Sequence, residues 1–383
     1  MIIYIKHQGA WVGRQGQTLV VKKEDFKQTI YTHRLKQLVI MGNVTLSNPA
    51  LSLLCKEQID TIFLTKNGRY KGRLESDENK NVFLTKRQFD SLNNPEFGLT
   101  LAQSIVGGKI SNMATLLGRL KRRNKHLDGR LFENRIKGIR QLLKQSQHAR
   151  TVNILRGYEG QSTKLFFEGF RYGFREEWHF RKRVRRPPTD PVNAVLSLLY
   201  TLLLNRIYAA VRVAGLNPMV GYLHALEYGR HSLTLDLIEE FRSIIAETCT
   251  LSLFNLKILQ QDDFYYEEPL VPEVEAQTRA HVTDDTIGYI YENPDDGMFD
   301  LPAQRVGQEE ELEHEPSAKR PCRLNQAAFK RVLEAFEEKI NTEFTHPLTG
   351  VRITYAEALV VQARHFRSII EGEQKTYQPL QMK

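Results

Sequence analysis

The spacing of apolar residues changes near residue 80, and this change constrains the fold more than any other feature of the chain. Before it, apolar and β-branched residues come in short runs separated by glycine and polar turns, as is typical of strands. The runs are Ile2–Ile5, Thr18–Val21, Gln37–Ile40, Asp60–Leu64 and Arg69–Leu74. Asn67-Gly68 predicts a hairpin turn, and Ser47-Asn48-Pro49 predicts the start of a short helix. Residues 1–80 are therefore predicted to form a small β-sandwich-like domain.

After residue 80 the apolar residues recur at helical spacing, beginning with Leu101, Ile105 and Ile110. Asp190-Pro191 is a typical helix start, and the stretch Val192–Val213 behind it is mostly apolar. Asparagines and arginines interrupt that stretch, so we expect a buried central helix and no membrane span. Two closing helices are expected over 325–345 and 354–371. The predicted fold class is α+β, with residues 81–383 forming a larger, all-α domain.

Charge is distributed very unevenly along the chain. The net charge is +9, yet residues 262–315 contain seventeen acidic and only two basic residues, so the remainder carries +24. Such a basic body favours a polyanionic partner, although net charge alone does not identify it. The acidic segment has little periodicity, and we interpret about 266–322 as a disordered or loosely ordered insertion. It is either a tolerated surface loop or a segment that folds back and competes with DNA.

Two clusters of basic residues are candidates for phosphate binding. We predict DNA contacts from Arg122, Arg123, Arg181, Arg183, Arg185 and Arg186. Aromatic residues between Phe170 and Phe180 are interleaved with the second cluster. Their rings could stack on unpaired bases or belong to the core, and the sequence leaves both interpretations open.

The three cysteines are far apart and form no CxxC pair, so neither a zinc ribbon nor a disulfide framework is expected. Reduced cysteines indicate the cytoplasm. The N-terminus is apolar but short, and it lacks the layout of a signal peptide.

Acidic and imidazole side chains occur beside apolar helical patterns in three separate segments. Glu159 follows Tyr158, His224 ends the segment Gly221-Tyr222-Leu223-His224, and Asp236 and Glu239 share one face of a predicted helix. Carboxylates with one imidazole suit Mg²⁺ or Mn²⁺. Each residue taken alone is more often structural than functional, so the spacings by themselves are weak.

The set of motifs resembles the CRISPR-associated integrase, the universal endonuclease subunit of spacer acquisition. The resemblance rests on motifs that occur in the right order: Tyr158-Glu159-Gly160, the Asp190-Pro191-Val192-Asn193 stretch, Gly221–His224, Ser232–Arg242, Gln362-Ala363-Arg364 and the ending Tyr377-Gln378-Pro379-Leu380. It covers nearly the whole chain apart from roughly 266–322, where the long acidic insertion departs from the family pattern.

The resemblance implies that Glu159, His224 and Glu239 bind the metal, with Asp236 as a nearby acid in the same pocket. It also implies that the larger all-α domain is the catalytic domain of a metal-dependent enzyme, which joins 3′-OH ends of captured double-stranded DNA fragments into the CRISPR repeat array. The implied assembly is a heterohexamer, in which two homodimers flank a dimer of a small ferredoxin-like adaptation protein.

Two alternatives remain open from the sequence. One is a non-catalytic basic DNA-binding scaffold, in which the three candidate ligands are structural. The other is a transposon-borne relative of the same integrase family. The sequence also leaves open whether Glu240 contributes to the metal site.

Overall fold

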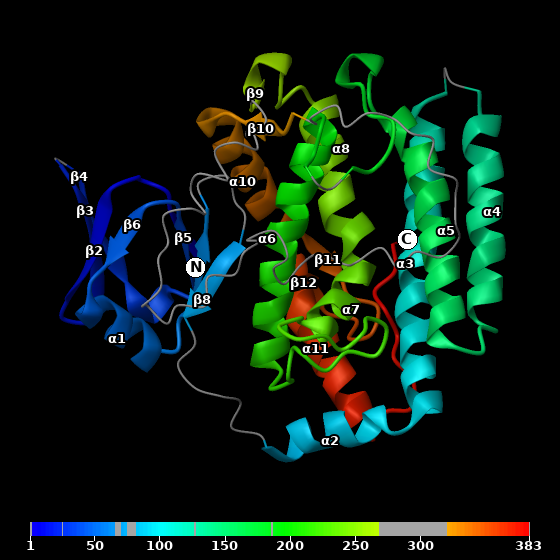
Figure 1. Cartoon of the computed structure of the whole chain (residues 1–383), viewed down its shortest axis with the longest axis horizontal. Helices are drawn as coiled ribbons and strands as arrows, with labels where there is room; N and C mark the ends of the chain where they lie inside the picture. Colours follow the sequence, from blue (N-terminus) through cyan, green and yellow to red (C-terminus); the bar gives the residue numbers. More distant parts are fainter. Residues whose placement is uncertain are drawn as a thin grey trace, which may run out of the picture.

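The protein consists of a β-rich N-terminal part and a mostly helical remainder (Figure 1). The structure is a computed structural model, which describes residues 2–24, 26–65, 70–74, 82–125, 128–184, 187–267 and 320–382. The predicted α+β fold class is confirmed.

Two four-stranded sheets make up the N-terminal part, in the orders β1-β5-β7-β8 and β4-β3-β2-β6. Their strands are β1 (Ile2–Ile5), β2 (Ala10–Gln15), β3 (Thr18–Lys23), β4 (Phe26–Tyr31), β5 (Gln37–Met41), β6 (Val44–Leu46), β7 (Asp60–Leu64) and β8 (Tyr70–Leu74). Strand β5 runs parallel to both β1 and β7, whereas β7 and β8 are antiparallel, as the predicted hairpin requires. The Asn67-Gly68 turn itself lies outside the described residues.

Apolar side chains from both sheets meet in one core. Val12 and Leu19 from one sheet and Leu38 from the other are fully buried together with Leu53 of helix α1 (Asn48–Lys56). Helix α1 begins where the sequence predicts, because the Ser47 hydroxyl accepts a hydrogen bond from the backbone N–H of Ala50.

Helices follow one another through most of the remaining chain. They are α2 (Val82–Leu92), α3 (Pro95–Arg123), α4 (Arg130–Ser146), α5 (Val152–Phe170), α6 (Pro191–Val213), α7 (Ser232–Phe241), α8 (Thr248–Asn255), α10 (Gln326–Ile340) and α11 (Tyr355–Ile370). The expectation of an all-α part was wrong in detail. Residues 264–266 pair with 322–324 (β9–β10), and 343–345 pair with 352–354 (β11–β12), each as an antiparallel ribbon. Because the second ribbon begins at Glu343, the helix that was predicted over 325–345 ends at Ile340.

Helix α6 lies in the middle of the helical part (Figure 1). Asp190 caps its first turn by accepting a hydrogen bond from the backbone N–H of Asn193, as the sequence predicts. The helix is long and apolar enough to cross a membrane, but 78% of its most apolar window is buried inside the protein. The prediction of a buried central helix is therefore confirmed.

The ribbon β9–β10 brings together the two ends of the predicted acidic insertion. Tyr266 lies opposite Cys322, and Phe264 lies opposite Leu324. The insertion thus leaves and re-enters the helical part at one place. Residues 268–319 lie outside the described residues, so the two interpretations of the acidic segment stay predictions.

The aromatic residues near the second basic cluster belong to the core. Phe170 is fully buried, and Phe174, Trp178 and Phe180 are at most 9% exposed. Phe174 and Phe180 form an edge-to-face pair with centroids 5.4 Å apart. These four rings are buried in aromatic contacts, so base stacking by them is excluded and the core interpretation is correct for them. Tyr172 is only partly buried, and for this residue both interpretations stay open.

His346, in the turn after β11, gives the protein an expected pH dependence. The side chain is fully buried, and neither ring nitrogen has a hydrogen-bond partner within the described ranges. Burial, and then the nearby His365, lower the pKa of His346.

A histidine that folds in its neutral form stabilises the protein above the pKa of the unfolded state, and this stability is lost as the pH falls. We expect the unfolding free energy to decrease below about pH 6.5 by up to ~1.4 kcal/mol per pH unit for this one proton. His346→Leu should flatten that slope in chemical denaturation at pH 7.5, 6.5 and 5.5, and an unchanged slope would contradict the assignment.

Candidate metal centre

Three neighbouring helices place two carboxylates on one buried amino group. Lys109 of α3 forms an ion pair with Oε1 of Glu159 on α5, and its Nζ lies 2.5 Å from Oε2 of Glu239 on α7. Both α5 and α7 pack against α3 (Figure 1). The side chain of Glu239 is 3% exposed and that of Glu159 is 23% exposed, so the pair opens towards solvent on the Glu159 side.

Positive neighbours keep Glu239 ionised. Burial opposes the charged form of Glu239. Arg242, Lys109 and His224 outweigh burial, however, and lower the pKa of this carboxyl to about 2. Arg242 contributes directly, because its Nε lies 3.1 Å from Oε2 of Glu239. A buried anion paired with the cationic Lys109 and Arg242 can accept a further cation only if one of these two neighbours gives way.

Asp236 orients the side chain of His224 through hydrogen bonds. Its Oδ1 lies 2.6 Å from Nδ1 of His224 and accepts the backbone N–H of the same residue at 2.9 Å. Its Oδ2 accepts the backbone N–H groups of Tyr222 and Leu223 at 2.6 and 3.0 Å. With the proton of the ring on Nδ1, Nε2 carries a lone pair that can bind a metal. Asp236 is 0% exposed, and its oxygens are engaged by the 222–224 segment, so its place is that of a positioning residue.

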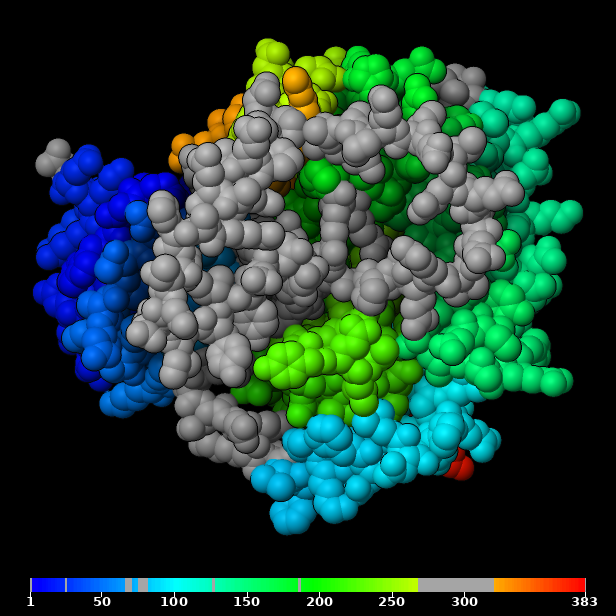
Figure 2. All heavy atoms as spheres, in the orientation of Figure 1, coloured from blue at the N-terminus to red at the C-terminus, as the bar shows by residue number. Residues whose placement is uncertain are grey.

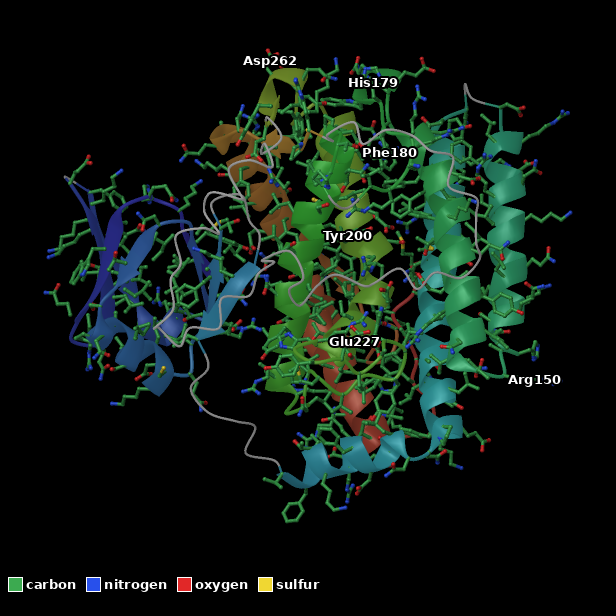
Figure 3. The ribbon with its side chains drawn as sticks, in the orientation of Figure 1. Arg150, His179, Phe180, Tyr200, Glu227 and Asp262 are labelled. Atoms are coloured by element: carbon green, nitrogen blue, oxygen red, sulfur yellow. The ribbon has the colours of Figure 1, made fainter. Side chains whose placement is uncertain are left out.

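Close packing fixes the loop that carries His224. Leu233 N donates to Pro218 O at 3.0 Å, and the Ser232 hydroxyl donates to Ala225 O at 2.7 Å. Arg156 of α5 reaches the same loop and donates from Nε to Leu223 O at 2.7 Å. This loop contributes to the visible surface above α2 (bright green in Figure 2), and Glu227 lies within it (Figure 3).

Gly221 is required where this loop meets the first turn of α7. A Cβ atom at Gly221 would lie 2.6 Å from the carbonyl carbon of Ser232 and 2.8 Å from the nitrogen of Leu233. Since both are backbone atoms, we expect Gly221→Ala to lower the unfolding free energy by about 1–3 kcal/mol and to displace His224. Gly157→Ala is the control, because nothing lies within 4 Å of a Cβ there. Equal melting temperatures of the two variants would show that the loop adapts without cost.

Glu240 faces away from this centre. Its Oε1 accepts the hydroxyl of Tyr377 at 2.6 Å, and its Oε2 accepts Nε2 of Gln362 at 2.9 Å and the backbone N–H of Leu380. Burial raises the pKa of the Glu240 carboxyl to about 7. Glu240 therefore anchors the C-terminal tail to α7 and α11, which explains the local role of the Gln362 and Tyr377 motifs.

A π-helical turn continues α7 from Arg242 to Glu247. It brings Arg242 over the ring of Tyr200 on α6, with the guanidinium carbon 4.7 Å from the ring centroid. The hydroxyl of Tyr200 in turn donates to Glu247 at 2.7 Å. Figure 3 shows Tyr200 in the interior of the helical part. The turn thereby supports the guanidinium that pairs with Glu239.

The donor set suits a hard or borderline divalent cation. Two carboxylates converge on one positive group, and the neighbouring imidazole has Nε2 available. Across the part of the chain that the structure describes, no group of three acidic, histidine or cysteine side chains is gathered closely enough to enclose an ion. The carboxylates hold Lys109 instead. The chemistry of the residues therefore fits Mg²⁺ or Mn²⁺, and the assignment of the three ligands stays a prediction.

The candidate DNA-binding arginines divide into three groups. Arg122 and Arg123 are exposed at the end of α3, and Arg181 is exposed as well. Arg183 is partly buried, and its Nη1 donates to Oδ1 of Asn193 at 2.8 Å, which indicates a structural anchor of the loop before α6. Arg185 and Arg186 lie outside the described residues.

Comparisons with known proteins identify the family of the chain. A family model described as "CRISPR associated protein Cas1" matches residues 3–282. The CRISPR-associated endonuclease Cas1 3 of Thermus thermophilus is 32% identical over 381 residues, which cover 99% of this chain and 96% of that protein. The chain belongs to the Cas1 family. The expected family and its class, nucleases and integrases of CRISPR adaptation, are thereby confirmed.

Solved structures with the same fold include a casposase bound to an integration product and a Cas6-RT-Cas1–Cas2 complex. The casposase has a TM-score of 0.76 at 17% identity, covering 100% of this chain and 94% of that chain. The Cas6-RT-Cas1 chain also has a TM-score of 0.76, at 22% identity, and this chain spans 36% of its length. Both likenesses show the fold alone.

Lys109 and Arg242 were absent from the sequence-based site. The signal for Lys109 was a single lysine in the otherwise apolar stretch Ile105–Ile110 of a predicted helix. A buried lysine needs an anionic partner, but the sequence does not show which acids from other helices provide it.

Proposed function

We propose that the chain is the integrase and endonuclease of CRISPR adaptation, which joins the 3′-OH ends of captured DNA fragments to the CRISPR repeat. The observation that carries the proposal is the convergence of Glu159 and Glu239 beside an imidazole that Asp236 orients. Membership of the Cas1 family agrees with it. A non-catalytic scaffold would not need a buried acid, a second acid at the edge of the same centre and an oriented histidine in one place.

Glu159, His224 and Glu239 would hold Mg²⁺ or Mn²⁺. When bound, the metal would withdraw charge from the scissile phosphate and from the attacking hydroxyl. Asp236 holds the proton of His224 on Nδ1, which leaves Nε2 as the ligand atom. Arg242 keeps Glu239 charged in the absence of the metal.

The reaction is a transesterification. The 3′-hydroxyl oxygen of the fragment attacks a repeat phosphorus, a new phosphodiester bond forms, and the old P–O3′ bond breaks. The repeat strand leaves with its own 3′-hydroxyl, so the number of phosphodiester bonds is unchanged and no energy source is required. With water as the nucleophile the same site would cleave DNA. The role of the protein is to position the two strands, which provides much of the rate in such reactions.

Exposed basic side chains would supply this positioning. Helix α4 presents Arg130, Lys137, Arg140 and Lys144 to solvent, with Glu133 as the exposed acid among them. Arg150 follows the helix at the outer edge of the molecule (Figure 3). Together with Arg122 and Arg123, this surface can follow a DNA backbone.

The partners are inferred from the family and from a solved neighbour. The Cas6-RT-Cas1–Cas2 complex shows that a chain of this fold assembles with Cas2. We propose that this chain works in the cytoplasm as a homodimer, and that two homodimers flank a dimer of a small ferredoxin-like adaptation protein.

Joining of a labelled duplex with free 3′ ends into a supercoiled plasmid that bears a repeat array tests the proposal. The assay contains the small partner and Mn²⁺, Mg²⁺ or chelator. We expect metal-dependent joining by the wild type and none by His224→Ala, with equal DNA affinity. DNA binding without joining or nicking under any metal would support the scaffold alternative. Equal joining into a plasmid without the repeat array would indicate a target other than the CRISPR repeat.

A further inference from the structure

Lys109 is a charged residue in the interior of the helical part. It is 6% exposed, and its neighbours Val106, Ile110 and Met113 on α3 belong to the hydrophobic core. A buried ammonium group is costly unless anions compensate it. The anions here are Glu159 and Glu239, which are also the two carboxylates proposed to hold the metal.

The ammonium group holds these carboxylates where a metal would need them. Oε2 of Glu239 lies 2.5 Å from Nζ, and Oε1 of Glu159 contacts the same nitrogen. A divalent cation bound by both carboxylates would have to occupy the same space and would repel the ammonium charge. Both carboxylates form ion pairs with the amino group of Lys109, and a lysine that is compensated in this way stays cationic.

The backbone of Lys109 has little freedom to withdraw. Its neighbour Gly108 packs so closely on the tail that a Cβ there would lie 2.4 Å from Cβ of Pro379. Asn112, one turn further along α3, donates to the carbonyl oxygens of both Glu240 and Leu380 at 2.9 Å. Helix α3 is thus fixed to α7 and to the tail, and Nζ can leave the carboxylates only by rotation of its flexible side chain.

We propose that Lys109 is a built-in counter-ion that occupies the metal position in the metal-free protein, and that metal binding displaces its amino group from Glu159 and Glu239. The inference rests on the proposed function, because it assumes that these two carboxylates bind the metal. In this role Lys109 holds the three helices together before the metal binds, and it lowers the affinity for the metal. The competing view is a permanent ion pair, with the metal bound elsewhere.

Measurement of Mn²⁺ binding to the full chain by electron paramagnetic resonance titration tests this inference. Lys109→Met removes the charge and keeps the length, and Lys109→Arg keeps the charge. Lys121→Met is the matched control, because Lys121 lies on the same helix and forms an ion pair with Glu133 at the surface. We expect Lys109→Met to bind Mn²⁺ on the order of 10-fold more tightly than the wild type. The interaction energy between residues in contact commonly corresponds to about this factor in affinity. Lys109→Arg and Lys121→Met should not gain affinity.

Thermal unfolding gives a second readout that does not depend on activity. In chelator, Lys109→Met should melt at a lower temperature than the wild type, because two acids lose their counter-ion. Addition of Mn²⁺ should raise the melting temperature of Lys109→Met by more than it raises that of the wild type. If Lys109→Met does not fold, Lys109→Gln replaces it in both measurements. An unchanged Mn²⁺ affinity in the neutral variants would overturn the counter-ion role while leaving the metal site in place. Mn²⁺ binding that Glu239→Gln does not weaken, or no binding by any variant, would instead overturn the proposed metal site and the inference with it.

Discussion

Glu239→Gln is expected to abolish DNA joining while leaving DNA binding intact. The carboxylate is 3% exposed and forms ion pairs with Lys109 and Arg242. Loss of its charge removes one of the two acidic ligands that we propose, and a bound metal contributes several kcal/mol to the stabilisation of the transition state. We expect single-turnover joining to fall about 10³-fold, equivalent to ~4 kcal/mol.

DNA affinity should not change in the same variant, because a buried anion makes no contact with phosphate. Glu227→Gln is the matched control: this acid is 45% exposed and belongs to the loop that carries His224. Both variants are compared at matched salt for joining and for DNA affinity. Joining by Glu239→Gln at more than about a tenth of the wild-type rate, one factor of ten, would contradict its assignment as a ligand.

Asp236→Asn is expected to have the second largest effect. Asp236 accepts four hydrogen bonds, three from backbone N–H groups and one from Nδ1 of His224. An amide places a donor where one oxygen was, so donors are left unpaired in a site with 0% exposure. We expect Mn²⁺ affinity to drop about 10–100-fold, as is usual when a residue that orients a ligand is lost. The unfolding free energy should decrease by about 1–3 kcal/mol.

Two readouts separate orientation from general damage in this variant. Asp262→Asn serves as the control, because Asp262 is an exposed acid remote from the centre (Figure 3). If Asp236→Asn loses stability but keeps its Mn²⁺ affinity, the residue supports the loop without orienting His224. If it loses neither, the hydrogen bonds to the 222–224 segment have no measurable role.

Helices whose signals are local could be predicted from the sequence. Helix α6 begins at the predicted cap, and helix α1 begins at the Ser47 cap. Strand β4 was not predicted, because its residues are almost all exposed and show no apolar alternation. Ribbon β9–β10 was not predicted either. It joins residues more than 50 positions apart, and such a pairing leaves no local pattern.

The candidate site shows the same division between local and distant information. Asp236 and Glu239 were correctly placed on one helix, and His224 was correctly placed near them. The different tasks of Glu239 and Glu240 could not be predicted, since adjacent helical residues face different neighbours and both are acids. The position of Lys109 between Glu159 and Glu239 depends on the packing of three helices that are distant in sequence.

The most direct test of the central claim is the position of Mn²⁺ in a crystal of the full chain, located by its anomalous scattering. The account predicts one peak at about 2.0–2.3 Å from a carboxylate oxygen of Glu159, one of Glu239 and Nε2 of His224. The amino group of Lys109 should have moved away from both carboxylates. A peak bound by other residues would contradict the account. So would the absence of Mn²⁺ from these three residues in the crystal of a protein that joins DNA in solution.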